Sequence, residues 1–164
     1  MADRYLIRHS ASFLAVTLLL AAPPLAAQTG RLSVGVHAGV YAAEGLRDGW
    51  FLGAQATVPM IRGIEVAGSY SAWVLDPRDF ATAAVTLRST LRGSPSGSRF
   101  YAGIGAIYDN STPDRIHGIF DTAVVGAEFP GGAVRPFAEA RISRIIWGGA
   151  GTVHLAAGMS IGPR

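Results

Sequence analysis

The chain of 164 residues is 49% hydrophobic and only 15% charged, and it contains 21 glycines. Because soluble domains carry about 25% charged residues, this composition argues against a surface that meets water on all sides. Cysteine is absent, which excludes a disulfide framework and a thiolate metal site. The 14 basic residues are all arginine and are spread along the chain. Nucleic-acid binding requires a clustered basic patch, so we expect no nucleic-acid partner.

The N-terminal segment has the layout of an export signal. Arg4 and Arg8 are followed by the apolar run Ala11–Ala22, by two prolines and by small residues, which is the order found in cleavable signal peptides. We predict a signal peptide over residues 1–27 and a single domain over residues 28–164. The alternative is an uncleaved amphipathic anchor. No stretch of the later domain approaches the ~20 consecutive apolar residues of a transmembrane helix.

Behind this signal, polar and apolar residues alternate with a period of two, the pattern of a β-strand with one apolar face. The pattern recurs between turn residues and predicts eight strands: Arg31–Tyr41, Trp50–Val58, Gly63–Val74, Phe80–Leu91, Arg99–Tyr108, Ile116–Phe129, Val134–Ile145 and Thr152–Gly162. In the second, Leu52 and Val58 fall on the apolar face and Gln55 and Thr57 on the other. The sixth is the least regular, because Asp121 breaks the alternation, and we expect a bulge or an early strand end there.

The connections between these segments fall into two classes. Those after the second, fourth and sixth segments are turns rich in proline, glycine and serine, typical of the periplasmic side of bacterial barrels. The other connections carry acids that we expect to contact cations, lipopolysaccharide-bound ions or partners, with simple solvation as the alternative: Glu44, Asp48, Asp76, Asp79, Asp109 and Asp114. Arginines gather at the opposite rim, where they would meet phosphate-bearing headgroups: Arg31, Arg62, Arg92, Arg99 and Arg135. Both termini are then expected on the periplasmic side.

An alternating barrel can turn its apolar face outward to lipid or inward to a ligand. The low charge content favours lipid, and the predicted fold class is all-β, an eight-stranded antiparallel up-and-down transmembrane β-barrel preceded by a signal peptide. Aromatic residues near both ends of the strands favour an interfacial girdle, although aromatic residues are also common in strands generally. The alternative is a soluble periplasmic lipocalin-like binding barrel, which would expose the Gly, Ser, Thr and Ala face to water.

Three late stretches carry a resemblance to a known family: Val125-Gly-Ala-Glu-Phe-Pro130, Arg135-Pro-Phe-Ala-Glu-Ala-Arg141 and Leu155-Ala-Ala-Gly-Met-Ser-Ile161. They resemble the late strands of the small eight-stranded outer-membrane β-barrels of the opacity-protein and OmpA-transmembrane type. The resemblance implies a bacterial outer-membrane location, with outer-membrane lipid, lipopolysaccharide and the outer-membrane assembly machinery as partners. We also expect a monomer. Barrels of this family usually end in an aromatic residue that the machinery reads, whereas this chain ends Ile161-Gly-Pro-Arg164.

The polar face, turned inward, places charged residues inside the barrel. The predicted polar network of the lumen is Glu65, Arg88, Glu128, Arg135, Glu139, Arg141, His37 and His154. Since a buried charge is costly unless it is paired, we expect Glu128 to pair with Arg135 across a turn, and Glu65 to lie level with Arg88. Eight strands enclose a space only just wide enough for side chains. This argues against a continuous pore, although inward glycines and serines would leave room for a small cavity.

Some barrels that resemble this one are lipid A-modifying enzymes, and such catalysis would need a nucleophile within hydrogen-bond reach of a base. Ser143, His154 and Glu139 lie on the inward faces of adjacent predicted strands. Lipid A deacylases, however, carry serine and histidine close together on the lipid-facing side of one strand, which this chain does not match. His37 and His154 are too few for a metal site. We therefore expect no cofactor and a non-enzymatic protein with a structural or surface-interaction role; the alternative is a narrow conduit for small solutes or ions.

Overall fold

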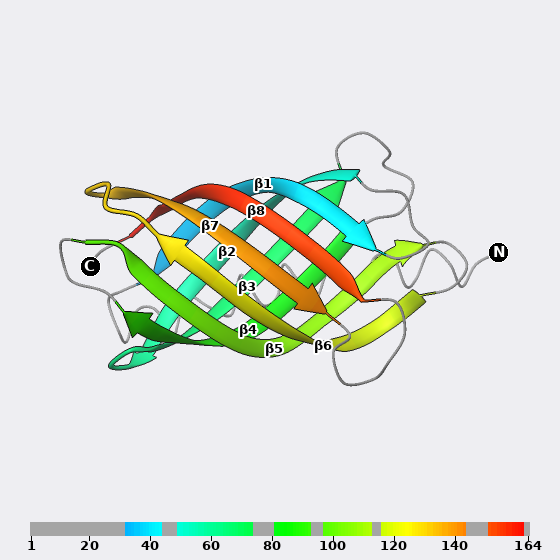
Figure 1. The fold of residues 1–164 in the computed structure, drawn as a ribbon, viewed down its shortest axis with the longest axis horizontal. Coiled ribbons are helices and arrows are strands. Elements are labelled where there is room, and N and C mark those ends of the chain that lie inside the picture. Colours follow the sequence, from blue (N-terminus) through cyan, green and yellow to red (C-terminus); the bar gives the residue numbers. More distant parts are fainter. Residues whose placement is uncertain are drawn as a thin grey trace.

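The computed structural model describes residues 32–43, 49–73, 81–92, 97–112, 116–143 and 151–162, and within them it forms one closed β-barrel. The strands are β1 (Ser33–Ala43), β2 (Gly49–Ile61), β3 (Ile64–Trp73), β4 (Ala81–Arg92), β5 (Arg99–Thr112), β6 (Ile116–Glu128), β7 (Val134–Ser143) and β8 (Thr152–Ile161). Each strand pairs antiparallel with the next, and β1 closes the barrel against β8 (Figure 1). The eight-stranded barrel predicted from the alternation is confirmed, with strand ends shifted by a few residues.

The two ends of the barrel differ in how the strands are joined. Tight turns connect β2 to β3 and β6 to β7 at one end, where Gly63 and Gly132 adopt φ angles of 78° and 66°. Glycine reaches this left-handed region without steric cost. β1 begins and β8 ends at the same end, because the strands alternate in direction and their number is even. We call this the turn end, on the left in Figure 1, and the opposite end the loop end.

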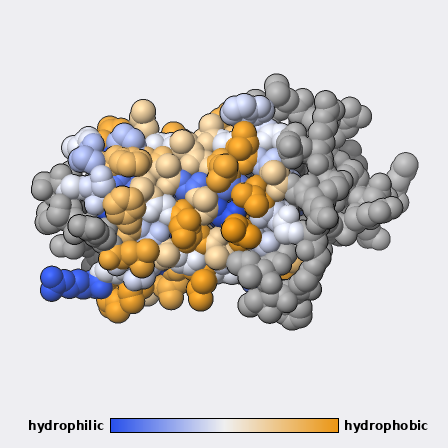
Figure 2. Space-filling model, in the orientation of Figure 1, coloured by the Kyte–Doolittle hydropathy of each residue, from blue (hydrophilic) through white to orange (hydrophobic). Residues whose placement is uncertain are grey.

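The outward face of the strands is apolar, as the alternation predicted. Ile104 and Ile119 are 71% and 72% exposed, and Val36 is 65% exposed. Figure 2 shows hydrophobic side chains gathered in a broad band over the face in view. An apolar band of this size around a closed barrel suits lipid rather than water. It argues against the lipocalin-like alternative, which needs the apolar residues inside.

The predicted irregularity of the sixth strand is wrong. β6 keeps its alternation through this position: Thr122 and Val124 are buried, and Asp121 falls on the outward face opposite Ala106 of β5. A polar side chain does not by itself interrupt a strand, because the face a residue occupies follows only from its position along the pleat. The pairing of β5 with β6 shifts elsewhere, beside Asn110.

Val58 also departs from expectation. Its position on the alternating pattern predicts an outward side chain, yet it is only 7% exposed. Val58 immediately precedes the irregularity between Pro59 and Ile61 in the pairing of β2 with β3. The pairing of Val58 with Val66 is still regular, so this shift does not explain the low exposure of Val58.

No helix in the part of the chain described here is long and apolar enough to cross a membrane. The signal peptide predicted over residues 1–27 lies outside the described residues.

Candidate functional site: the barrel lumen

Two groups of ion pairs occupy the lumen, and the first lies at the turn end. We call Glu65, Arg99, Glu128 and Arg135 the turn-end cluster. Arg99 donates from Nη1 and Nη2 to the two carboxylate oxygens of Glu65, at 2.7 and 3.2 Å, and from Nη2 to Glu128 at 3.0 Å. Arg135 pairs with the other oxygen of Glu128 at 2.8 Å. Two acids thus balance two arginines, and the bidentate geometry adds directional strength.

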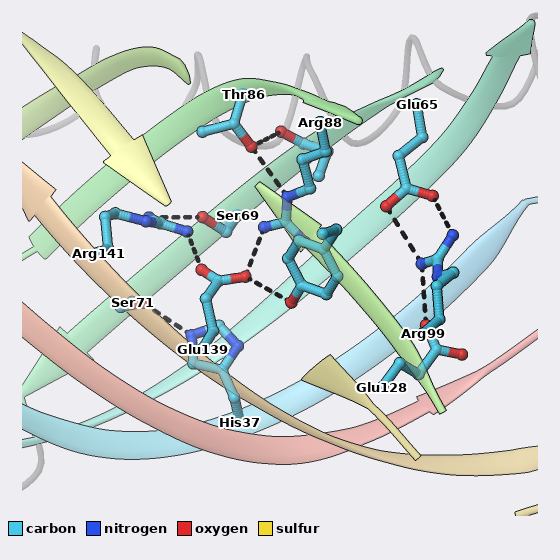
Figure 3. A network of polar contacts seen from close by, with 12 residues as sticks. His37, Glu65, Ser69, Ser71, Thr86, Arg88, Arg99, Glu128, Glu139 and Arg141 are labelled. Carbon is cyan, nitrogen blue, oxygen red and sulfur yellow. Dashed lines mark hydrogen bonds and ion pairs between the residues drawn. The ribbon is translucent and has the colours of Figure 1, made fainter. Parts of the chain in front are cut away.

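The second group lies deeper and is not balanced. Glu139 pairs with Arg88 through Oε2 and with Arg141 through Oε1, each at 2.7 Å. The Tyr101 hydroxyl donates to Glu139 Oε2 at 3.1 Å, and the Arg88 guanidinium lies over the Tyr101 ring, 4.9 Å from its centroid. We call these four residues the central cluster (Figure 3). It sets two arginines against one glutamate, and the charged side chains are at most 8% exposed.

Hydroxyl groups support the two arginines of the central cluster. Arg88 Nε donates to Thr86 Oγ1 at 3.1 Å, and Arg141 Nη1 donates to Ser69 Oγ at 3.1 Å. Ser69 lies on β3 and Arg141 on β7, so this bond crosses the lumen rather than joining neighbouring strands. Fixing a guanidinium with several acceptors restricts it to one orientation.

The strand register explains why Tyr101 reaches Glu139. Tyr101 of β5 pairs with Gly126 of β6, and Gly126 pairs in turn with Glu139 of β7. All three face the lumen, and Gly126 has no side chain to separate the other two. A Cβ atom placed on Gly126 would collide with the Tyr101 ring. The glycine therefore allows a contact between strands that are not adjacent.

His37 follows the same rule on the other side of the barrel. His37 of β1 pairs with Gly53 of β2, which pairs with Ser71 of β3. The imidazole lies over Gly53, where an added Cβ would meet it, and its Nε2 contacts Ser71 Oγ at 3.0 Å. At these two glycines a neighbouring ring occupies the space that a side chain would take.

An aromatic group packs around the two histidines of the lumen. The Tyr41 and His154 rings meet edge to face with centroids 4.7 Å apart, and Phe51 contacts both His154 and His37 at 5.8 and 5.9 Å. His37 also lies 6.3 Å from Phe137. The two histidines therefore belong to one packed group in which Phe51 lies between them. Tyr41 and Phe51 are 1% and 2% exposed, so both rings are buried inside the barrel.

The structure brings the eight predicted lumen residues together but changes some of the pairings. Glu128 and Arg135 form an ion pair across the β6–β7 turn. Glu65 lies opposite Arg88 in register, yet Glu65 binds Arg99 and Arg88 binds Glu139. Long guanidinium side chains reach across a narrow lumen, so the register neighbour is not necessarily the partner.

The expectations for the two rims are partly wrong. Asp109, expected in an exposed connection, lies within β5 and is fully buried. Arg99 and Arg135, expected to meet lipid headgroups at the rim, are held in the turn-end cluster, while Arg62 is exposed in the β2–β3 turn. The remaining predicted rim positions lie outside the described residues or have side chains that do: Glu44, Asp48, Asp76, Asp79, Asp114, Arg31 and Arg92.

Neither catalytic nor metal-binding geometry emerges from the described side chains. Ser143 donates its hydroxyl proton to Thr122 Oγ1 at 3.3 Å, whereas a serine nucleophile must present that proton to a base. The described residues contain no group of three or more His, Cys, Asp or Glu side chains arranged to hold a metal ion. Both oxygens of Glu139 are already occupied by arginines and Tyr101.

Comparisons with known proteins find structural but no sequence relatives. No protein-family model matches the chain, and no curated protein does. The N-terminal β-barrel domain of Pseudomonas aeruginosa OprF matches with a TM-score of 0.58 at 16% identity, over 79% of this chain and 97% of that one. The chain has the fold of the small eight-stranded transmembrane β-barrels.

Two other solved structures support this assignment. Neisserial surface protein A matches with a TM-score of 0.52 at 12% identity, over 80% of this chain and 95% of that one. A structure from the de novo design of transmembrane β-barrels matches with a TM-score of 0.58 at 18% identity, over 82% and 96% of the two chains. Because a designed barrel matches as well as a natural one, the likeness concerns architecture and does not carry a specific activity.

Proposed function

We propose that this chain is a non-enzymatic bacterial outer-membrane β-barrel protein with a structural or surface-interaction role. One observation carries the proposal: the closed barrel presents its apolar residues outward and buries its charged residues as ion pairs in the lumen. Such a distribution is stable only where lipid surrounds the barrel. The expected partners are outer-membrane lipid, lipopolysaccharide and the outer-membrane assembly machinery, and the expected state is a monomer.

The filling of the lumen supports a role at the surface rather than transport. The turn-end cluster ties β3, β5, β6 and β7 together. Near the loop ends of their strands, the rings of Tyr41, Phe51 and His154 pack against one another inside the barrel. A solute would have to separate several ion pairs to pass, and separating buried charges is costly. The connections at the loop end would then provide the surface for any partner, with the turn end facing the periplasm.

Fractionation of cells that express the chain tests the location. We expect the protein to remain with purified outer membranes after osmotic shock and to leave them only with detergent. An epitope inserted between Gly131 and Gly132, in the β6–β7 turn, tests the orientation, because it should be hidden from antibody in intact cells and reached after permeabilisation. Release by osmotic shock would contradict the membrane assignment, and labelling of intact cells would reverse the orientation.

The alternative role, a narrow conduit for small solutes or ions, is tested by planar-bilayer recording of the folded protein. The ion pairs of Glu139 with Arg88 and Arg141 predict an electrically silent barrel. Stable unitary currents that change with charge reversal at Glu139 or Arg141 would favour the conduit over the surface role.

A further inference from the structure

A small cavity lies in the lumen beside the central cluster. His37, Gln55, Ser71 and Arg141 line it with polar groups, and the rings of Phe51 and Phe137 complete part of the wall. Glu139 and His154 also border it, and the Glu139 carboxylate is held there by its ion pairs with Arg88 and Arg141. Its size allows about one water-sized occupant. The four polar residues come from β1, β2, β3 and β7, so the cavity lies inside the barrel and not between the barrel and lipid.

The charge around this cavity is positive. Arg88 and Arg141 share the single carboxylate of Glu139, which leaves the central cluster with one excess positive charge. The turn-end cluster is internally neutral and contributes no compensation. Asp109 also faces the lumen. It lies six residues along β5 from Gly103, which pairs with Arg88, and six residues of strand span about 20 Å. At that separation its attraction to the central arginines is weak.

Two residues that line the cavity each carry a buried nitrogen that lacks a hydrogen-bond partner among the described residues. Arg141 Nε makes no hydrogen bond with them, although Arg141 is only 6% exposed. A guanidinium nitrogen can only donate, so this N–H requires an acceptor. His37 Nδ1, on a residue 8% exposed, is in the same position. When Ser71 donates to His37 Nε2, the ring proton is on Nδ1 and becomes a second donor.

The geometry points to a binding site for one monatomic anion, such as chloride, in this cavity. The anion accepts hydrogen bonds from Arg141 Nε and His37 Nδ1 and neutralises the excess positive charge of the central cluster. A cation is excluded by the two arginines. A polyatomic anion such as sulfate or gluconate is too large for a space that admits about one water. A water molecule fits the space but leaves the charge uncompensated.

Bromide provides a direct probe, because it replaces chloride and scatters anomalously. The full chain, refolded in detergent micelles and crystallised from sodium bromide, should show one anomalous peak in the cavity within hydrogen-bond distance of Arg141 Nε. In urea unfolding at constant ionic strength, replacing gluconate with chloride at ten times its Kd should raise the folded-to-unfolded ratio about tenfold. Equal unfolding midpoints in chloride and gluconate, with no bromide peak, would show that the cavity holds water only and would overturn the site.

Two substitutions separate anion binding from a general effect of salt. Ala156 lines the cavity without a polar group, so Ala156→Val fills the space while every charge stays in place. We expect this variant to lose both the bromide peak and the chloride dependence. Gly68→Ala is the matched control, because an added Cβ there meets nothing within 4 Å, and it should keep both. Retention of the chloride dependence in Ala156→Val would place the anion elsewhere and contradict the assignment.

Discussion

The two faces of the same eight strands are stabilised in different ways. Outward side chains such as Ile104 and Ile119 are more than 70% exposed and need only be apolar, since lipid contacts them without a specific partner. Inward side chains such as Glu139 and Arg88 are buried and depend on named partners at defined distances. A substitution on the outward face should therefore act through polarity and depth. A substitution on the inward face should act through the loss of one particular contact.

The largest effect should come from removing the carboxylate of the central cluster. Glu139→Gln keeps the size of the side chain but leaves the buried guanidinium groups of Arg88 and Arg141 without a counter-charge. Breaking a buried ion pair from one side typically costs about 3–5 kcal/mol. Urea unfolding of the protein in lipid vesicles measures this loss. Glu128→Gln is the control, because Arg99 then keeps its bidentate contact with Glu65; an equal loss in both variants would contradict the difference drawn between the clusters.

The outward face is tested by placing a charge in it. Leu155 of β8 is half exposed and lies between Val40 and Ala140 in register. Leu155→Arg should cost about 2–4 kcal/mol if the position is near the bilayer midplane. Ile161→Arg, on the same face at the turn end of the same strand, should cost about 0–1 kcal/mol because the interface is near. Both are measured by reversible unfolding from lipid, and equal costs would show that β8 does not cross the bilayer as proposed.

Substituting one inward and one outward glycine gives a third test of the difference between the two faces of the strands. Gly126→Ala forces the Tyr101 ring away from its place and lengthens the hydrogen bond to Glu139, and we expect an overpacking cost of about 1–3 kcal/mol. Gly68→Ala, on the outward face with free space around it, should be neutral or slightly stabilising because strand glycines carry an entropic cost. Urea midpoints of the two variants give the difference directly.

A second substitution identifies the cause of the Gly126 effect. Tyr101→Phe removes the hydroxyl that binds Glu139 while keeping the ring. If Gly126→Ala acts by breaking that hydrogen bond, the double variant should lose less than the sum of the two single losses. Strict additivity would show that the glycine acts only through packing of the ring.

The outward face and the positions of the strands could be predicted from the sequence because they depend on local alternation alone. Each residue's face follows from its position along the pleat, and apolar residues at every second position identify the lipid side. Asp121 shows the limit of judging a strand by polarity: its side chain is charged, but the strand continues through it. The apolar pattern ends before Asp109 and so predicts an exposed connection there, whereas β5 continues to Thr112.

The partners inside the lumen could be predicted only in part. Glu128 and Arg135 flank a short turn, so sequence distance alone places them together. The alternation does not identify Arg99, Tyr101 and Ser69 as members of the network. Their respective contacts with Glu65, Glu139 and Arg141 join strands that are not adjacent in the sheet or in the sequence. The signal that could have located Tyr101 is Gly126, since an inward glycine beside an inward aromatic residue allows the ring to reach the next strand. Finding that pair requires the register, which alternation does not supply.

The smallest effect should come from the turn-end cluster, and its dependence on salt distinguishes it from the central cluster. Arg135 forms an ion pair with Glu128, and its side chain is 15% exposed. Arg135→Gln leaves Glu128 bound to Arg99, so we expect a loss of only about 1 kcal/mol or less, as for ion pairs near water.

Raising the salt concentration to 1 M shortens the Debye length to about 3 Å. The difference between Arg135→Gln and the unsubstituted chain should then shrink, whereas the loss in Glu139→Gln, which lies away from solvent, should persist. Unfolding midpoints at low and high sodium gluconate measure both without adding chloride, and a salt response shared by the two variants would show that the lumen is equally open to solvent at both levels.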